Sequence, residues 1–330
     1  MVWRNPWYVS AKSHHTPHGF QNTEPDSREK GDLNKWRKMR KQQGVPHPPV
    51  GGYAAFRDQW VMPLSLDGED DRLWWLGHAS LMLRISGRYL LIDPVFSRRA
   101  SPLPFVGPER KTPAPLTIGD LPHLDAVLIS HNHYDHLDKP TIRQIIATFP
   151  AVQFLVPCGL ERWFIRLGAR NVVSLDWWQH HRVAGAEIHA VPARHWSRRS
   201  LFDKNRSLWC GWVISHCGFR FWFSGDSGFT RSLLEIPQRL GPFTHAALPV
   251  GAYAPEWFMK NHHMSPAEAV VLFEAAGQPV TVPIHWGVFE LGDEGLDTPP
   301  QALSEAMSHY PPLTAERFSA WKIGDSRPLT

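Results

Sequence analysis

Cysteine is scarce in this chain of 330 residues. The three cysteines, Cys158, Cys210 and Cys217, are an odd number and form no C-x-x-C pair. The sequence therefore indicates neither a disulfide framework nor a thiolate zinc site, and it favours a reducing compartment.

Long apolar runs are also absent. No segment reaches the roughly 18 apolar residues of a membrane-spanning helix, and the first residues lack the apolar stretch of a secretory signal. We therefore expect a protein that is cytoplasmic or peripheral on a membrane. Its 42% hydrophobic and 20% charged residues are typical of a folded globular chain.

Positive charge is concentrated near the N-terminus. Residues 28–41 contain seven Lys or Arg and two acidic residues, whereas the whole chain has a net charge of +4. Within this run, "KWRKMRK" places Trp36 and Met39 three residues apart, as on one edge of a helix. That edge could lie on an anionic membrane, but a solvated, partly ordered arm is the simpler interpretation. No nucleic-acid-binding motif accompanies the run, so we expect no nucleic-acid partner.

The sequence pattern changes near residue 70. Residues 1–70 are rich in Pro, Gly, His and charge, and they are predicted to form an N-terminal arm, extended or partly helical, without a core of its own. From residue 71 onward, short apolar runs such as "RYLLID" and "VTVPI" alternate with helix signals, for example Ser265 and Glu268 at capping-box spacing. This interleaving predicts an α/β domain over residues 71–330, with sheets covered by helices.

Three histidines and two aspartates crowd into one nine-residue segment, "SHNHYDHLD". The segment follows the predicted buried strand "DAVLIS" and ends at Asp138, where a helix is expected to begin. Alternate side chains of an extended segment share a side, so His131 and His133 can reach one metal ion. Asp135 and His136 can reach a second ion a few ångströms away.

Such a cluster requires partners elsewhere, because each zinc ion takes about four ligands, or three and a water. His195, Asp226 and His285 each follow an apolar run, as expected of loops that converge at one edge of a sheet. The first ion would take His195 as its third ligand and the second would take His285, with Asp226 bridging both. A single mononuclear site is the alternative. The predicted metal-ligand set is His131, His133, Asp135, His136, His195, Asp226 and His285.

The box "HNHYDH", with its downstream partners, resembles the metal-binding signature of the metallo-β-lactamase superfamily. The resemblance implies an αββα sandwich, in which two mixed β-sheets are flanked by helices and a two-metal site lies along one edge. Further motifs from about residue 74 to about residue 324 resemble the N-acylphosphatidylethanolamine-hydrolysing phospholipase D family. They are "WLGHAS", "DPVFSRRASP", "LDWW", "RHWSRR", "FSGDSGF", "PVGAYAPEWFMK" and "IHWGVF".

This resemblance implies a zinc-dependent phosphodiesterase of the phospholipase D type, with two Zn2+ per chain. Such an enzyme hydrolyses N-acylphosphatidylethanolamine-like phospholipids to N-acylethanolamine and phosphatidic acid by attack of a metal-bound hydroxide. One alternative is a soluble two-zinc hydrolase of a water-soluble phosphodiester or lactone. The other is a non-catalytic, metal-containing membrane-binding protein. His and carboxylate ligands would also suit manganese or iron. The sequence carries no signal for an oligomeric state.

The same resemblance assigns two catalytic residues. Asp93, at the end of "RYLLID", matches a family aspartate that would orient a ligand histidine or position the attacking water, although a simple turn aspartate is the alternative. His263, in "KNHHMSP", matches an active-site histidine that would protonate the leaving alkoxide or hold the phosphate. His78 is assigned to the strand framework. Residues 252–259, "AYAPEWFM", are expected to form an exposed apolar contact.

Overall fold

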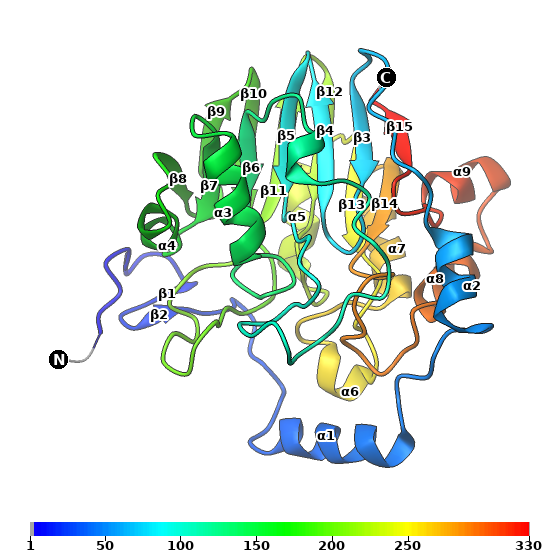
Figure 1. Cartoon of the computed structure of the whole chain (residues 1–330). Coiled ribbons are helices and arrows are strands. Elements are labelled where there is room, and N and C mark those ends of the chain that lie inside the picture. The colour runs from blue at the N-terminus through cyan, green and yellow to red at the C-terminus, as the bar shows by residue number, and fades with distance from the viewer. Residues whose placement is uncertain (1–2, 330) are drawn as a thin grey trace.

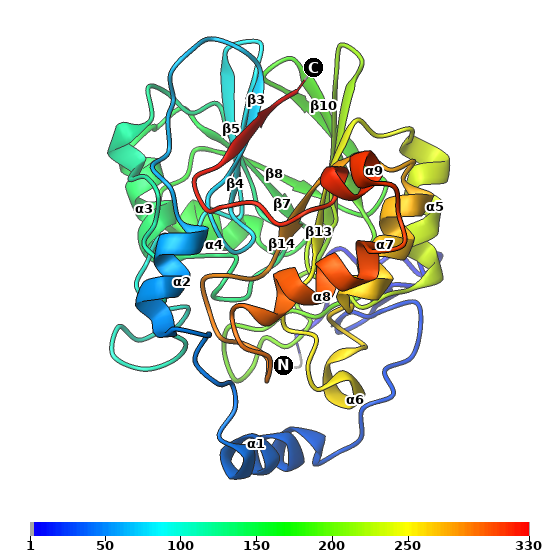
Figure 2. The same cartoon turned by 90° about the vertical axis from the view of Figure 1, so that its right-hand side faces the viewer.

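Two β-sheets lie face to face in the computed structural model, which describes residues 3–329 (Figures 1 and 2). Helices cover the outer faces of both sheets, so the predicted αββα sandwich of two mixed sheets is confirmed. Residues 1, 2 and 330, at the ends of the predicted arm and domain, lie outside the described residues.

The two sheets contain seven and six strands. The first sheet runs, in spatial order, β15 (Ser326–Pro328), β3 (Arg72–Trp75), β4 (Leu81–Ile85), β5 (Arg88–Ile92), β6 (Ala126–Leu128), β7 (Gln153–Pro157) and β8 (Asn171–Leu175). The second runs β14 (Val280–Ile284), β13 (His245–Pro249), β12 (Phe219–Phe223), β11 (Gly211–His216), β10 (Ala186–Val191) and β9 (His180–Val183). A short hairpin pairs β1 (His15–Thr16) with β2 (Gly19–Phe20).

The helices follow the start signals of the sequence where those signals are strong. Asp138 is the N-cap of α3, and Ser265 and Glu268 form the predicted capping box of α7. The helices are α1 (Asp32–Gln43), α2 (Gly52–Trp60), α3 (Lys139–Thr148), α4 (Glu161–Arg166), α5 (Arg231–Leu240), α6 (Glu256–Met259), α7 (Pro266–Ala275), α8 (Thr298–Met307) and α9 (Pro312–Arg317), with a 3-10 turn at Ile118–Asp120. Within residues 3–329, none of these helices has the length and apolar character needed to cross a bilayer.

The inner strands of the first sheet, β3 to β7, are buried on both faces, which explains their nearly continuous apolar sequences. In β4, Leu81 and Leu83 belong to the core between the sheets, whereas Met82 points into the layer beneath α3 and α4. Because side chains alternate along a strand, one strand contributes residues to two hydrophobic cores.

Parallel pairing brings several strand ends to the same edge of the sandwich. β5 runs parallel to β6, and β12, β13 and β14 run parallel to one another. β10 and β12 both pair antiparallel with β11, so they point the same way. Polar residues follow β5, β6, β10, β12 and β14. These residues consequently lie next to one another at this edge of the sandwich.

Residues 3–60 lie against the domain rather than apart from it. Phe20 and Phe56 are buried in the core between the sheets. On α1, Trp36 stacks on Phe258 with ring centroids 4.8 Å apart, so its apolar edge faces the protein. The prediction of an exposed apolar contact at residues 252–259 is wrong, because Phe258 and Met259 are buried.

Asp176, in the "LDWW" motif, holds the N-terminal segment at a second place. Its buried carboxylate contacts Lys12 Nζ at 2.5 Å, His14 Nε2 at 2.7 Å and His15 Nε2 at 3.0 Å. Burial by itself would raise the pKa of Asp176, but hydrogen bonds from His14 and Lys12 hold that pKa well below its usual 3.8. The ionised carboxylate thus stabilises the attachment of residues 12–15.

We expect Asp176→Asn to lower the free energy of unfolding by about 3 kcal/mol at pH 7, the cost of breaking a buried ion pair. Because the folded-state pKa lies below 3.8, this contribution is complete above pH 3.8 and is lost as the pH falls through the lower value. In urea denaturation, the difference in the free energy of unfolding between wild type and variant should therefore decrease as the pH is lowered below 3.8.

The exposed Asp58 offers a matched control. Asp58→Asn should change the free energy of unfolding by less than about 0.5 kcal/mol. Equal stabilities for Asp176→Asn and Asp58→Asn would contradict a role for Asp176 in holding the N-terminal segment.

Candidate metal centre

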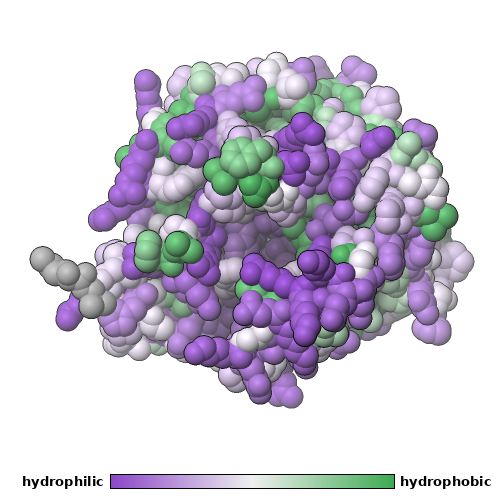
Figure 3. All heavy atoms as spheres, turned by 60° about the horizontal axis from the view of Figure 1, so that its bottom comes forward, coloured by the Kyte–Doolittle hydropathy of each residue, from purple (hydrophilic) through white to green (hydrophobic). Residues whose placement is uncertain are grey.

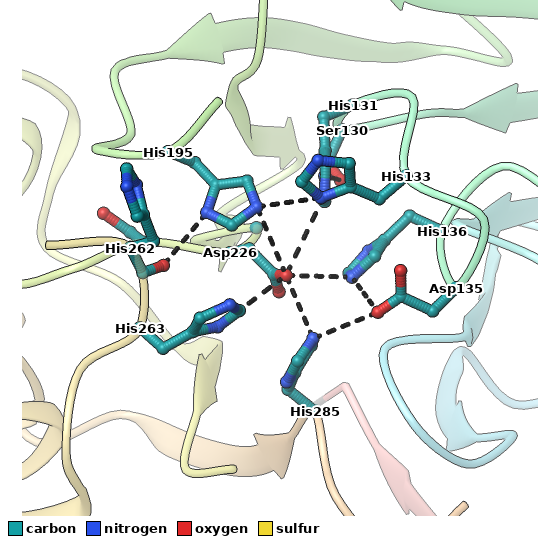
Figure 4. A network of polar contacts seen from close by, with 12 residues as sticks. Ser130, His131, His133, Asp135, His136, His195, Asp226, His262, His263 and His285 are labelled. Atoms are coloured by element: carbon teal, nitrogen blue, oxygen red, sulfur yellow. Dashed lines mark hydrogen bonds and ion pairs between the residues drawn. The ribbon is translucent and has the colours of Figure 1, made fainter. Parts of the chain in front are cut away.

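All seven predicted metal ligands converge at the edge where the strand ends meet (Figure 4). The loop after β6 carries four of them, and the loops after β10, β12 and β14 carry the other three. Asp226 lies at the centre of the group, with imidazole rings around it. Residues separated by up to 154 positions in the chain are therefore neighbours in space.

His131, His133 and His195 form one half of the centre. His133 Nδ1 lies 2.9 Å from His131 Nε2 and 3.1 Å from His195 Nε2. Donor atoms of the three side chains lie within 4.8 Å of one another. Three converging imidazole nitrogens are a usual arrangement for a zinc ion with an open fourth position.

Asp135, His136 and His285 form the other half. Asp135 Oδ2 lies 3.5 Å from His136 Nε2 and 3.3 Å from His285 Nε2. His78 joins them, since its Nε2 lies 3.0 Å from the same carboxylate oxygen. The assignment of His78 to the strand framework is thus wrong, because the turn after β3 directs this side chain at the centre.

Asp226 connects the two halves. Its Oδ2 lies 2.9 Å from His285 Nε2 and 3.1 Å from His136 Nε2. The same oxygen lies 3.9 Å from His131 Nε2 and 3.8 Å from His195 Nε2. A single carboxylate therefore faces donors from both halves, as the predicted bridging position requires.

The chemistry of the donors fits metal ions. Among residues 3–329, His133 Nε2 and Asp226 Oδ1 are buried and have no hydrogen-bond partner, and His136 Nε2 and His285 Nε2 contact only the carboxylates of Asp135 and Asp226. A buried polar atom without a partner costs about 1 to 3 kcal/mol, so these atoms favour a cation that they share. Burial also lowers the pKa of His131 and of His195, which keeps both imidazoles in the neutral form that binds metals.

The charge of the centre also calls for a cation. Burial opposes ionisation of Asp226, yet the neighbouring His136 and His285 hold its pKa well below the usual range. Against the effect of burial, the charge of Asp226 and bonds to Asp135 and Asp226 raise the pKa of His285 to about 9. The buried Asp226 and the largely buried Asp135 thus require positive charge, supplied by protonated imidazoles or by metal ions.

Asp93 lies behind the centre. It is fully buried, and its Oδ2 accepts a hydrogen bond from His136 Nδ1 at 2.8 Å. The other oxygen, Oδ1, accepts the backbone N–H of Ser130 at 2.7 Å. By fixing the Nδ1 proton, Asp93 directs His136 Nε2 at Asp226, which favours orientation of a ligand over direct contact with attacking water.

His263 lies on the open side of the centre. Its Nδ1 is 3.9 Å from Asp226 Oδ2, and its ring centroid is 5.0 Å from that of His285. The neighbouring His262 points elsewhere: its Nε2 lies 3.1 Å from Asp26, and its carbonyl oxygen accepts a hydrogen bond from His195 Nδ1 at 3.0 Å. The two adjacent histidines therefore have different surroundings.

Asn22 is a site residue that the sequence did not suggest. Its side-chain nitrogen donates to the carbonyl of His195 at 2.9 Å, and its oxygen accepts the backbone N–H of His195 at 3.1 Å. An asparagine in a polar segment 173 residues away carries no local signal of this contact. The turn glycine before His78, in contrast, was a signal that the "WLGHAS" motif is more than a strand.

Residues 88–286, more than half of the chain, match the Beta-lactamase superfamily domain. The chain belongs to the β-lactamase superfamily. Its fold and buried His and Asp clusters make it a metallo-hydrolase of that superfamily.

Several relatives are similar over most of this metallo-hydrolase. N-acyl-phosphatidylethanolamine-hydrolyzing phospholipase D 1 of Caenorhabditis elegans is 37% identical over 262 residues, which cover 76% of this chain and 74% of the relative. The mitochondrial N-acyl-phosphatidylethanolamine-hydrolyzing phospholipase D of Saccharomyces cerevisiae is 35% identical over 236 residues, covering 69% of this chain and 50% of the relative. The predicted family resemblance is confirmed by these matches.

Solved structures share the fold at low sequence identity. A possible metal-dependent hydrolase of Veillonella parvula aligns with a TM-score of 0.64 and 14% identity, covering 79% of this chain and 100% of that one. The metallo hydrolase Igni18 of Ignicoccus hospitalis aligns with a TM-score of 0.57 and 18% identity, covering 78% of this chain and 97% of that one. These alignments support the architecture alone.

Removal of bound metal with EDTA should destabilise this metallo-hydrolase, because the buried carboxylates then lose their counter-charge. Metal at a thousand times its Kd would contribute about 4 kcal/mol to the free energy of unfolding. We expect thermal denaturation to show a lower Tm after chelation and recovery when metal is restored.

His133→Ala should reduce both the metal content and this chelator-induced shift in Tm. His309→Ala, at an exposed histidine outside the centre, should leave both unchanged. If elemental analysis showed complete loss of metal without any change in Tm, the assignment of these buried side chains as ligands would be contradicted.

Proposed function

We propose that this protein is a zinc-dependent phosphodiesterase of the phospholipase D type. Its substrates would be N-acylphosphatidylethanolamine-like phospholipids, and its products N-acylethanolamine and phosphatidic acid. The observation that carries the proposal is the convergence of two sets of donors on Asp226, in a chain similar to two proteins named for that activity.

The two halves of the centre would each hold one Zn2+. His131, His133 and His195 would hold the first, and Asp135, His136 and His285 the second, with Asp226 between them. Bound there, the ions would polarise a phosphoryl oxygen and supply a nucleophile near neutral pH. His78, which contacts Asp135, would set the orientation of that carboxylate.

The remaining side chains would divide the other tasks. Asp93 would keep His136 in the tautomer that presents Nε2 to the centre. His263, on the open side, would hold the substrate phosphate or protonate the oxygen of the departing N-acylethanolamine. Because Asp93 acts through His136, it would be a positioning residue, whereas His263 would touch the substrate.

A phospholipid substrate also requires access to a lipid surface. Five large apolar side chains are at least 45% exposed on two loops: Leu103, Phe105, Val106, Leu201 and Phe202. Figure 3 shows hydrophobic patches beside a hollow on the face that is lowest in Figure 1. Such patches support peripheral membrane contact, one of the two predicted locations, the other being cytoplasmic.

The decisive experiment is mass spectrometry of the products. Zinc-loaded protein would be incubated with phosphatidylcholine vesicles that contain N-palmitoyl phosphatidylethanolamine, in isotopically labelled water. We expect release of N-palmitoylethanolamine and of phosphatidic acid that carries the label, because water attacks phosphorus. Turnover of a chromogenic phosphodiester, without any product from the vesicles, would instead favour a hydrolase of water-soluble substrates.

His263→Asn should lower kcat by about a hundredfold to ten-thousandfold, the usual contribution of a positioned acid or base. Metal content and Tm should stay within error of wild type, since His263 is in neither half of the proposed ligand set. His309→Asn serves as the matched control and should keep full activity. An unchanged kcat for His263→Asn would remove this residue from the mechanism.

A further inference from the structure

A cavity of about 470 Å³ lies between the N-terminal segment and the domain, next to the metal centre. This volume is within the usual range of small-molecule sites. His263 lines the cavity and also faces Asp226, so the cavity continues from the centre. The opposite wall is formed by residues 26–36, which precede the superfamily domain matched at residues 88–286.

The N-terminal segment is held firmly on the upstream side of this cavity. Asn22 makes two hydrogen bonds with the backbone of His195, as described above. Asp26 contacts His262 Nε2 at 3.1 Å, and Arg194 donates to the carbonyl of Pro25 at 2.8 Å. These contacts therefore hold the N-terminal segment to His195, a proposed metal ligand, and to its neighbours Arg194 and His262.

The downstream side is anchored through α1. Trp36 stacks on Phe258, and its Nε1 donates to Asp293 Oδ1 at 2.9 Å. Arg40 donates to the carbonyl of Leu291 at 3.2 Å. Figures 1 and 2 both show α1 beside α6 at the lower end of the molecule. Residues 29–33 therefore span the cavity between two fixed points.

The apolar part of the cavity wall comes from both sides. Leu33 and Trp36 contribute from α1, and Trp196, Phe258 and Met259 contribute from the domain. Leu33 is 44% exposed although it lines the cavity, so a ligand could cover the rest of its surface. This combination suits a hydrocarbon chain.

The charged part of the wall is cationic in effect. Lys30, Arg198 and Lys204 line the cavity. Of the acidic residues, Asp26 is bound by Arg28 and His262, and Asp32 accepts the backbone N–H of Glu29 at 2.7 Å. With Arg28, the wall carries four cations against the three carboxylates of Asp26, Glu29 and Asp32, and this net charge of +1 favours an anionic ligand.

We propose that this cavity binds the hydrocarbon chain of an anionic amphiphile whose phosphate lies toward the metal centre. Leu33 and Trp36 then determine chain preference, and Arg198 and Lys204 attract the anion. The inference rests on the proposed function, because it places part of the same substrate. It assigns specificity to the N-terminal segment, while the superfamily domain supplies the metal centre.

Binding of dodecyl phosphate and butyl phosphate to the metal-loaded full chain tests this assignment. Isothermal titration calorimetry, below the concentration at which dodecyl phosphate forms micelles, should show at least tenfold tighter binding of the long chain. Leu33→Gln should weaken the binding of dodecyl phosphate about tenfold and that of butyl phosphate less than twofold, because only the long chain reaches α1.

Leu313→Gln is a closely matched control. Leu313 is the second residue of α9, as Leu33 is of α1, and its side chain is 79% exposed away from the cavity. This variant should bind both probes like wild type. Lys204→Gln should weaken the binding of both probes by a similar factor, and this loss of affinity should be smaller at high salt.

Equal affinities of the two probes for wild type would overturn the assignment, and so would equal binding of dodecyl phosphate by wild type and Leu33→Gln. A loss of the same size in Leu313→Gln would overturn it as well. Neither probe is a phosphodiester, so the measurement involves no turnover. Failure of phospholipid hydrolysis and failure of this cavity assignment are therefore separate results.

Discussion

The structure depends on keeping two carboxylates, Asp135 and Asp226, ionised inside a protein. Removing such charges from water is costly unless opposite charge lies within a few ångströms. Asp226 Oδ2 has five imidazole nitrogens within 3.9 Å, and four of them come from loops that follow strands of both sheets. The need for shared cations therefore ties together the two halves of the sandwich, and a loop that moved would leave a buried charge uncompensated.

Strand direction makes this concentration of charge possible. Parallel strands end at one edge, and a side chain just past a strand end can turn toward a neighbouring loop without breaking a ladder of hydrogen bonds. Asp93 and His285 show the cost of that turn, with φ angles of 43° and 67°. Non-glycine residues hold such angles when surrounding contacts compensate, as the bonds from His136 and Ser130 do at Asp93.

The sequence was sufficient for the features that local pattern determines. Apolar runs ending in His or Asp predicted the inner strands, the polar residues at their ends and the convergence of seven side chains. Edge strands β8 and β9 were missed because they are half-buried and lack a continuous apolar run. His78 was misassigned because its role depends on a contact with Asp135, 57 residues away. Asn22 and the packing of residues 252–259 likewise depend on tertiary contacts that no spacing rule encodes.

The N-terminal segment connects substrate choice to the metal centre through short, direct contacts. Asn22 holds the backbone of His195, and Asp26 holds His262, whose carbonyl fixes the other ring nitrogen of His195. A displacement of α1 would therefore disturb both the cavity wall and the orientation of one proposed ligand. In such an arrangement the chemistry can stay with the superfamily domain, whereas a segment outside it selects the molecule on which that chemistry acts.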